Sequence, residues 1–317
     1  MVWVGGAVLV ALVALVAPPV AATERPIIGV LAQEVPPSLR PKVQGATSYV
    51  AAGYVKAVEA AGARAVPVFI NKTLEYYKYI MSSVNGLVLP GGDSDFTVPD
   101  GYAAAGRILL NIVVKLQDSG ISFPVLGVCQ GYEFLMFLAS KVSNPMDFLV
   151  PCNANNSALP LEFLPGFLES RIYKIASNEI LDILKTLPVT SNHHRECVTE
   201  AKLKEFHLED SWRVLSTNKD AGGLEFVSSS EHFQRPIVGV QFHPEKNMYE
   251  WNPHQANPHS RKAILSARLF YDWLVTESRA NDQKFPSLSR ETEALIYNYN
   301  PLYTGGKGGY DEQMYFF

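Results

Sequence analysis

The sequence predicts an α/β fold, with a mostly parallel central sheet flanked by helices and an added antiparallel portion. In the first half, short apolar runs alternate with helical segments, which is typical of parallel strands joined by crossover helices. In the second half, shorter β-like pieces follow at hairpin spacing. The 317-residue chain shows no internal repeat or linker, so we expect a single domain over residues 23–317.

The elements of the first half alternate between strand and helix. The expected strands are 26–31, 65–70, 86–89 and 124–128, and the expected helices are 48–61, 102–118 and 132–140. Each strand is a short apolar run, as expected for strands that are buried on both faces.

The second half has β-like pieces at 213–215, 223–227 and 237–242. A helix is expected at 260–279, where apolar residues recur on one face and predict packing on the sheet. The tail from Asn281 is polar, then aromatic and glycine-rich, and gives no prediction.

The composition is that of a globular protein, with 47% hydrophobic and 18% charged residues. The formal net charge of -4 argues against nucleic-acid binding as the main activity, because no broad basic field is available. An acidic substrate therefore needs a local basic site.

Residues 1–22 resemble a secretory signal peptide. They contain no charged side chain, and their apolar core at 3–16 is too short to span a bilayer comfortably. Small residues at 20–22 suit a signal peptidase, so we expect cleavage after Ala22, although a basic residue before the apolar run is missing. A membrane anchor is the alternative, and the two prolines that end the run disfavour it.

Two Asn-x-Ser/Thr triplets, at Asn71 and Asn155, fit passage through the secretory pathway as glycosylation sites. The chain has three cysteines, and an odd number leaves at least one thiol unpaired in an oxidising route. Cys152 and Cys197 either pair with each other or stay free, and the sequence does not decide between these.

Residues 127–131 (GVCQG) lie between the predicted strand 124–128 and the helical run 132–140. This pattern predicts a nucleophile elbow, in which a tight turn exposes Cys129 and the flanking glycines leave room for neighbouring backbone. The N-terminus of the following helix favours the thiolate. The alternative is a small buried cysteine in a glycine-rich turn.

Residues 239–245 (GVQFHPE) end a predicted strand in His-Pro-Glu. His243 at a strand end can point its ring at a nucleophile, while Glu245 fixes the tautomer of the imidazole. Alone, His-Pro-Glu is more often a surface turn. A cysteine nucleophile needs a base that a third group holds, so the two motifs support each other.

Residues 89–93 (LPGGD) follow another strand, at the sheet edge where open α/β folds place their ligands. An amide N–H of Gly91 or Gly92, together with that of Gln130, can form an oxyanion hole. A plain glycine turn is the alternative.

Pro-Gly-Gly, Gly-x-Cys-x-Gly and Phe-His-Pro-Glu in this order resemble the class I glutamine amidotransferase superfamily, whose fold is a flavodoxin-like sandwich. Within it, the chain is most similar to the gamma-glutamyl hydrolase family, also called folylpoly-gamma-glutamate hydrolases. The runs 61–67 (AGARAVP), 240–247 (VQFHPEKN) and 249–251 (YEW) carry this likeness. It covers nearly the whole mature chain.

The resemblance implies Cys129 as nucleophile, His243 as general base and acid, and Glu245 as its orienting partner. The family's additional active-site histidine, in an Asn-x-His segment, matches His194. Side chains alternate along an extended segment, so a slip of one residue would place His193 there instead. The alternative is that both are exposed loop histidines, and no spacing supports a metal site.

The favoured activity is cysteine-dependent hydrolysis of gamma-glutamyl amide bonds, with poly-gamma-glutamyl folates as the small-molecule substrates and no cofactor. The resemblance also implies a lysosomal or extracellular homodimer. Lys246 and Arg195 are candidate cations for the anionic substrate tail. The alternatives are a glutaminase subunit, which hands ammonia to a synthetase, and a binding module that kept the fold without activity.

Overall fold

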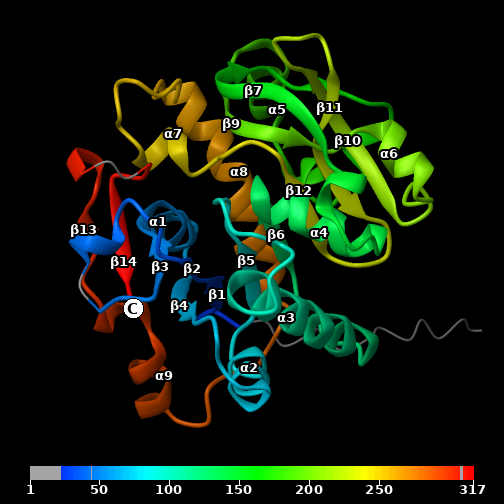
Figure 1. Ribbon diagram of the computed structural model, residues 1–317. Helices are drawn as coiled ribbons and strands as arrows, with labels where there is room; N and C mark the ends of the chain where they lie inside the picture. The colour runs from blue at the N-terminus through cyan, green and yellow to red at the C-terminus, as the bar shows by residue number, and fades with distance from the viewer. Residues whose placement is uncertain (1–22, 44, 308–309) are drawn as a thin grey trace, which may run out of the picture.

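The computed structural model describes residues 23–43, 45–307 and 310–317 (Figure 1), so the signal peptide expected at 1–22 lies outside the described residues. An eight-stranded sheet forms the centre. Its strands in spatial order are β4 (Arg64–Val68), β1 (Ile27–Leu31), β5 (Gly86–Leu89), β6 (Val125–Val128), β12 (Ile237–Val240), β11 (Glu225–His232), β10 (Trp212–Lys219) and β8 (Glu162–Phe163).

The first five of these strands are parallel, and the last three continue the sheet in antiparallel pairing. The parallel strands have a doubly wound order, in which the second strand in sequence lies outside the first. The predicted fold class, mostly parallel with an added antiparallel portion, is therefore confirmed. Val128 of β6 is opposite Val240 of β12, so the two predicted site motifs leave the sheet at the same edge.

Helices cover both faces of the parallel part. On one face, α8 (Arg261–Ser278) packs on β1, β5 and β6, and α1 (Ala52–Ala60) packs beside it. On the other, α4 (Gln130–Ser140) packs on β5, β6 and β12 and contacts α3 (Gly101–Asp118), which lies next to α2 (Leu74–Met81). The remaining helices are α5 (Asn178–Thr186), α6 (Glu200–Glu205), α7 (Lys246–Tyr249) and α9 (Leu288–Ala294).

Two smaller sheets flank the centre (Figure 1). One pairs β7 (Val150–Leu159) with β9 (Thr190–Cys197), and neither strand was predicted. The other has the order β13 (Leu302–Tyr303), β14 (Gln313–Phe316), β3 (Ser48–Ala51), β2 (Gln33–Glu34). The C-terminal tail, which gave no prediction, thus supplies two strands.

The prediction of a helix at 48–61 is wrong for its first turn. Residues 48–51 form β3, and the helix begins at Ala52. Tyr49 and Val50 favour a strand, and β14 from the far end of the chain pairs with them. Within the residues that the structure describes, no helix is long and apolar enough to cross a membrane.

Candidate active site

The turn between β6 and α4 has the strained geometry of a nucleophile elbow. Cys129 has φ 49° and ψ -112°, a backbone conformation that L residues rarely adopt. A Cβ atom on Gly127 would lie 2.9 Å from the Gly131 carbonyl oxygen, and one on Gly131 would lie 2.0 Å from that of Leu89. Both glycines are therefore needed for the backbone to pass, as the sequence pattern predicts.

The segment after β12 holds His243 and Glu245 together. Nδ1 of His243 donates to Oε1 of Glu245 at 2.7 Å, and both side chains are buried. The backbone N–H of His243 donates to the Ser191 carbonyl on β9, which fixes the strand end. Tyr271 of α8 donates to the other Glu245 oxygen at 3.5 Å. The carboxylate thus selects the Nδ1–H tautomer and leaves Nε2 as the acceptor nitrogen.

Gly91 is the point where the nucleophile and the imidazole meet. A Cβ on Gly91 would lie 2.6 Å from Cε1 of His243 and 3.1 Å from Cβ of Cys129. The missing side chain is what lets these two groups approach each other. The structure thus brings Cys129, His243, Glu245 and Gly91 into one cluster, as the sequence-based hypothesis requires.

The amides that were expected to form an oxyanion hole differ in their partners. The Gly91 N–H donates to the Tyr54 hydroxyl at 2.8 Å, and that hydroxyl lies 3.4 Å from Nδ1 of His243. Gly92 lies so close to Gln33 that a Cβ there would be 2.0 Å from its Nε2. The Gln130 N–H interacts with the Cys129 sulfur. The Gly91 amide is therefore already engaged.

The surroundings of the nucleophile favour its neutral thiol form. Burial, then the Glu133 carboxylate, raises the pKa of the Cys129 thiol well above its usual value, and the Gln130 N–H and the Lys246 charge oppose this only in part. Burial also raises the pKa of Glu133 to about 8, against a hydrogen bond from Gln241. At acidic pH Glu133 is therefore protonated, and its repulsion of a thiolate disappears.

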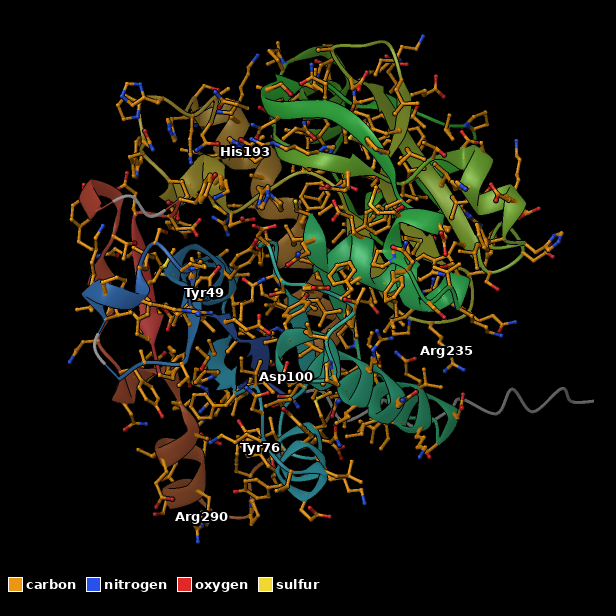
Figure 2. All side chains as sticks on the ribbon, in the orientation of Figure 1. Tyr49, Tyr76, Asp100, His193, Arg235 and Arg290 are labelled. Carbon is orange, nitrogen blue, oxygen red and sulfur yellow. A yellow bond between two sulfur atoms is a disulfide. The ribbon has the colours of Figure 1, made fainter. Side chains whose placement is uncertain are left out.

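The two adjacent histidines of β9 have different surroundings. His193, labelled in Figure 2, has its ring centroid 5.9 Å from that of His243, and its Nε2 lies 2.8 Å from Oδ1 of Asn257. His194 instead packs on Phe226, with its Nδ1 3.0 Å from the Glu196 carbonyl. Neighbouring side chains on β9 point to opposite faces, so only one histidine of the pair can face His243.

Cys152 and Cys197 form a disulfide that joins β7 to β9, and Cys129 is the free thiol among the described cysteines. Nδ1 of His194 lies 3.6 Å and 3.5 Å from the two sulfurs, a grouping close enough to hold a metal ion. The two sulfurs are bonded to each other, so neither is a thiolate that could bind a metal ion while the disulfide is intact. The disulfide answers the question that the sequence left open.

The two candidate cations have different surroundings. Nζ of Lys246 is buried and makes an ion pair with Asp311 at 2.7 Å, whereas Arg195 is exposed on β9. Burial alone would lower the pKa of Lys246, but the carboxylates of Asp311, Glu250 and Glu245 outweigh it and hold the pKa above its usual value. Lys246 is therefore a fixed ammonium next to the cluster.

Sequence reasoning missed Tyr54, Tyr271 and Gln33, which surround the cluster from α1, α8 and β2. Each is buried, and in the sequence each looks like an ordinary core or strand residue. Their roles depend on contacts between residues that lie far apart in the sequence, 26 positions for Tyr271 and Glu245 and 37 for Tyr54 and Gly91, which periodicity does not report.

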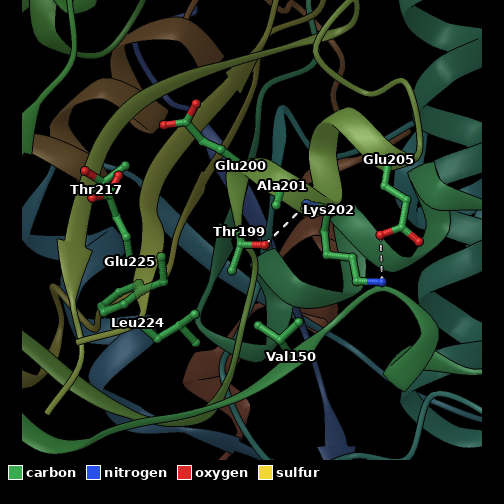
Figure 3. A pocket seen from close by; sticks show the side chains of 10 residues that line it. Val150, Thr199, Glu200, Ala201, Lys202, Glu205, Thr217, Leu224 and Glu225 are labelled. Atoms are coloured by element: carbon green, nitrogen blue, oxygen red, sulfur yellow. Dashed lines mark hydrogen bonds and ion pairs between the residues drawn. The ribbon is translucent and has the colours of Figure 1, made fainter. Parts of the chain in front are cut away.

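A cavity of about 450 Å³ opens elsewhere, on the antiparallel portion (Figure 3). An ion pair between Lys202 and Glu205 is part of its lining. None of the predicted site residues lines this cavity. Its lining is Val150, Thr199, Glu200, Ala201, Lys202, Glu205, Thr217, Leu224, Glu225 and Phe226.

Several known proteins are similar to this chain over most of its length. Gamma-glutamyl hydrolase of Homo sapiens is 37% identical, over 93% of this chain and 90% of its own length. Gamma-glutamyl hydrolase B of Dictyostelium discoideum is 36% identical, over 92% and 83%, and gamma-glutamyl hydrolase 2 of Arabidopsis thaliana is 31% identical, over 92% and 83%.

Among solved structures, a putative GMP synthase subunit from Thermoplasma acidophilum aligns over 79% of this chain and 94% of its own, with 16% identity and a TM-score of 0.44, too weak a likeness to argue from. The model of the Peptidase C26 family matches residues 26–245, which run from the residue before β1 to Glu245. This chain belongs to the peptidase C26 family.

Proposed function

We propose that this protein is a gamma-glutamyl hydrolase that acts through Cys129, with folylpoly-gamma-glutamates as its substrate class. The observation that carries the proposal is the convergence of the Cys129 elbow and the His243–Glu245 pair on Gly91. The names of the relatives support the linkage that is cut.

In the proposed mechanism, Nε2 of His243 takes the thiol proton as the Cys129 sulfur attacks the gamma-carbonyl carbon. The amides of Gly92 and Gln130 are the proposed donors to the oxyanion, since Tyr54 already occupies that of Gly91. His243 then gives the proton to the leaving amine, and a thioester remains. Water, deprotonated by His243, cleaves the thioester, and the new carboxylate leaves as the thiol is restored.

Glu245 and His193 support His243 in this scheme. Glu245 holds the Nδ1–H tautomer and stabilises the imidazolium that forms during both steps. His193 takes the place that the family resemblance gave to His194. Burial, then the charge of His243, lowers the pKa of His193 to about 4, so it stays neutral beside the imidazolium and adds no repulsion above that pH.

A secretory route to the lysosome or the extracellular space is also part of the proposal. The Cys152–Cys197 disulfide fits an oxidising compartment. Asn71 and Asn155 are both exposed, as glycosylation requires.

The secretory proposal is tested on protein from a eukaryotic host. We expect an N-terminus near Thr23 and a mass that falls on glycosidase treatment. Asn71→Gln and Asn155→Gln variants assign the glycans to each site. A retained Met1 together with a glycosidase-insensitive mass would reject the proposal. The homodimer implied by the resemblance is tested on the same material by sedimentation.

A glutaminase subunit would use the same cysteine, histidine and glutamate, so substrate choice separates it from a hydrolase. The decisive experiment is kcat/KM for a folate di- or pentaglutamate against free glutamine, at pH about 5, where a Cys–His pair can work. We expect a large preference for the gamma-linked substrate. Equal or greater efficiency on glutamine would overturn the proposal, and product analysis distinguishes endo- from exo-cleavage.

A further inference from the structure

The C-terminal segment returns to the edge of the candidate active site. Figure 1 shows β14 beside β3, the strand that runs directly into α1 and Tyr54. A side-chain hydrogen bond of 2.6 Å from Lys56 to Gln313 ties α1 to this segment. Asp311 therefore reaches the site from a position that is 66 residues beyond Glu245, through pairing of distant strands.

Asp311 forms an ion pair with Lys246, the residue that follows Glu245 in the sequence. The carboxylate lies 2.7 Å from Nζ of Lys246, and the two side chains are only 14% and 7% exposed. The charge of Lys246 lowers the pKa of Cys129 and of His193, so the ammonium lies within electrostatic reach of both. A buried charge pair next to the nucleophile is thus built partly from the C-terminal segment.

The other acids near Lys246 are committed elsewhere. Glu245 binds His243, and Glu250 accepts the backbone N–H of Glu312 at 2.5 Å. Burial, followed by the charge of Asp311, raises the pKa of Glu250 to about 8, so Glu250 is neutral at acidic pH. Asp311 is then the counterion of Lys246.

We propose that Asp311 is a specificity-determining residue. In the free enzyme its carboxylate binds Lys246, and in the complex the α-carboxylate of a gamma-glutamyl substrate takes its place. This inference rests on the proposed function. Asp311 and a substrate glutamyl unit offer the same group, a carboxylate on a short carbon chain, to an ammonium with three donors. The substrate must displace Asp311, and this competition weakens the binding of α-carboxylates.

The test compares Asp311→Asn with the parent at pH about 5, where a Cys–His pair can work. The substrates are a folate diglutamate and its analogue with a carboxamide for the α-carboxylate at the scissile unit. We expect Asp311→Asn to lower KM for the acid about tenfold, the scale of one charge-assisted contact, with little change in kcat. KM for the amide should stay within about twofold of the parent.

Two variants serve as controls. Glu312→Gln removes the same charge from the neighbouring residue, keeps its backbone bond to Glu250, and should leave KM unchanged. Asp311→Glu restores the competing carboxylate and should raise KM towards the parent value. If Asp311→Asn does not fold, Asp311→Ser takes its place, with the same expected fall in KM.

Equal changes on both substrates, or a rise in KM for the acid, would overturn the role of Asp311. A purely structural role would reduce kcat or the thermal midpoint without separating the two substrates. If the parent itself does not hydrolyse the folate diglutamate, the proposed function fails, and the two failures are thereby distinguished.

Discussion

The parallel and antiparallel parts of the molecule contribute to the site in different ways. The parallel strands deliver Cys129, Gly91 and His243 at strand ends, where chain direction alone brings them together. The antiparallel pair β7–β9 delivers His193 through strand register and is held by a disulfide. Local sequence motifs therefore locate the residues of the parallel part, whereas the position of His193 depends on which face of β9 turns inward.

The largest expected effect comes from the parallel part. Cys129→Ala should lower kcat by about 10⁴ or more, as loss of a catalytic triad member usually does. The fold should persist, because Gly127 and Gly131 shape the turn. Steady-state kinetics and circular dichroism check both statements, and activity within about tenfold of the parent would contradict the role of Cys129.

A smaller effect should separate the two histidines of β9. His193→Ala should lower kcat/KM by about 10²-fold, because a misplaced His243 loses alignment with the thiol. His194→Ala should leave kcat/KM within about threefold and instead cost about 1–3 kcal/mol of unfolding free energy, since its ring packs on Phe226 and the disulfide. The reverse pattern would restore His194 to the site.

The smallest effect is in the pH dependence of stability, to which the two parts contribute with opposite sign. The pKa of Glu133 is about 8 in the folded protein, against 4.5 for the unfolded chain. Glu133 therefore contributes stability below pH 4.5 that is lost as the pH rises towards 8. In the folded protein, burial lowers the pKa of His193 to about 4 and that of His194 to about 3, against 6.5 for the unfolded chain. Both histidines therefore contribute stability above pH 6.5 that is lost as the pH falls.

Between pH 4.5 and 6.5 the one carboxyl opposes two histidines, so we expect stability to rise with pH up to about 6.5 and to decline from there towards pH 8. Thermal midpoints across pH 3 to 9 measure this, within the span where these carboxyl and imidazole groups titrate. Glu133→Gln should flatten the alkaline decline and leave the acidic decline in place. An unchanged alkaline decline in that variant would remove Glu133 from the explanation.

The sequence predicted the parallel strands well, because buried strands are continuous apolar runs and glycine motifs mark their ends. It assigned residues 48–51 to a helix, because β14, which pairs with them, lies more than 250 positions away. The family resemblance assigned His194, and the sequence left a slip to His193 open, since the two are adjacent and only pairing with β7 sets the inward face.

The central claim is that Cys129 forms a thioester with a gamma-glutamyl substrate. Acid quenching of the enzyme during turnover of a folate diglutamate, followed by peptide mass spectrometry, tests it most directly. We predict an acyl adduct on the peptide that contains Cys129, absent in Cys129→Ala, with Cys152 and Cys197 still joined. An adduct on another residue, or turnover by the Cys129→Ala variant at the parent rate, would contradict the account.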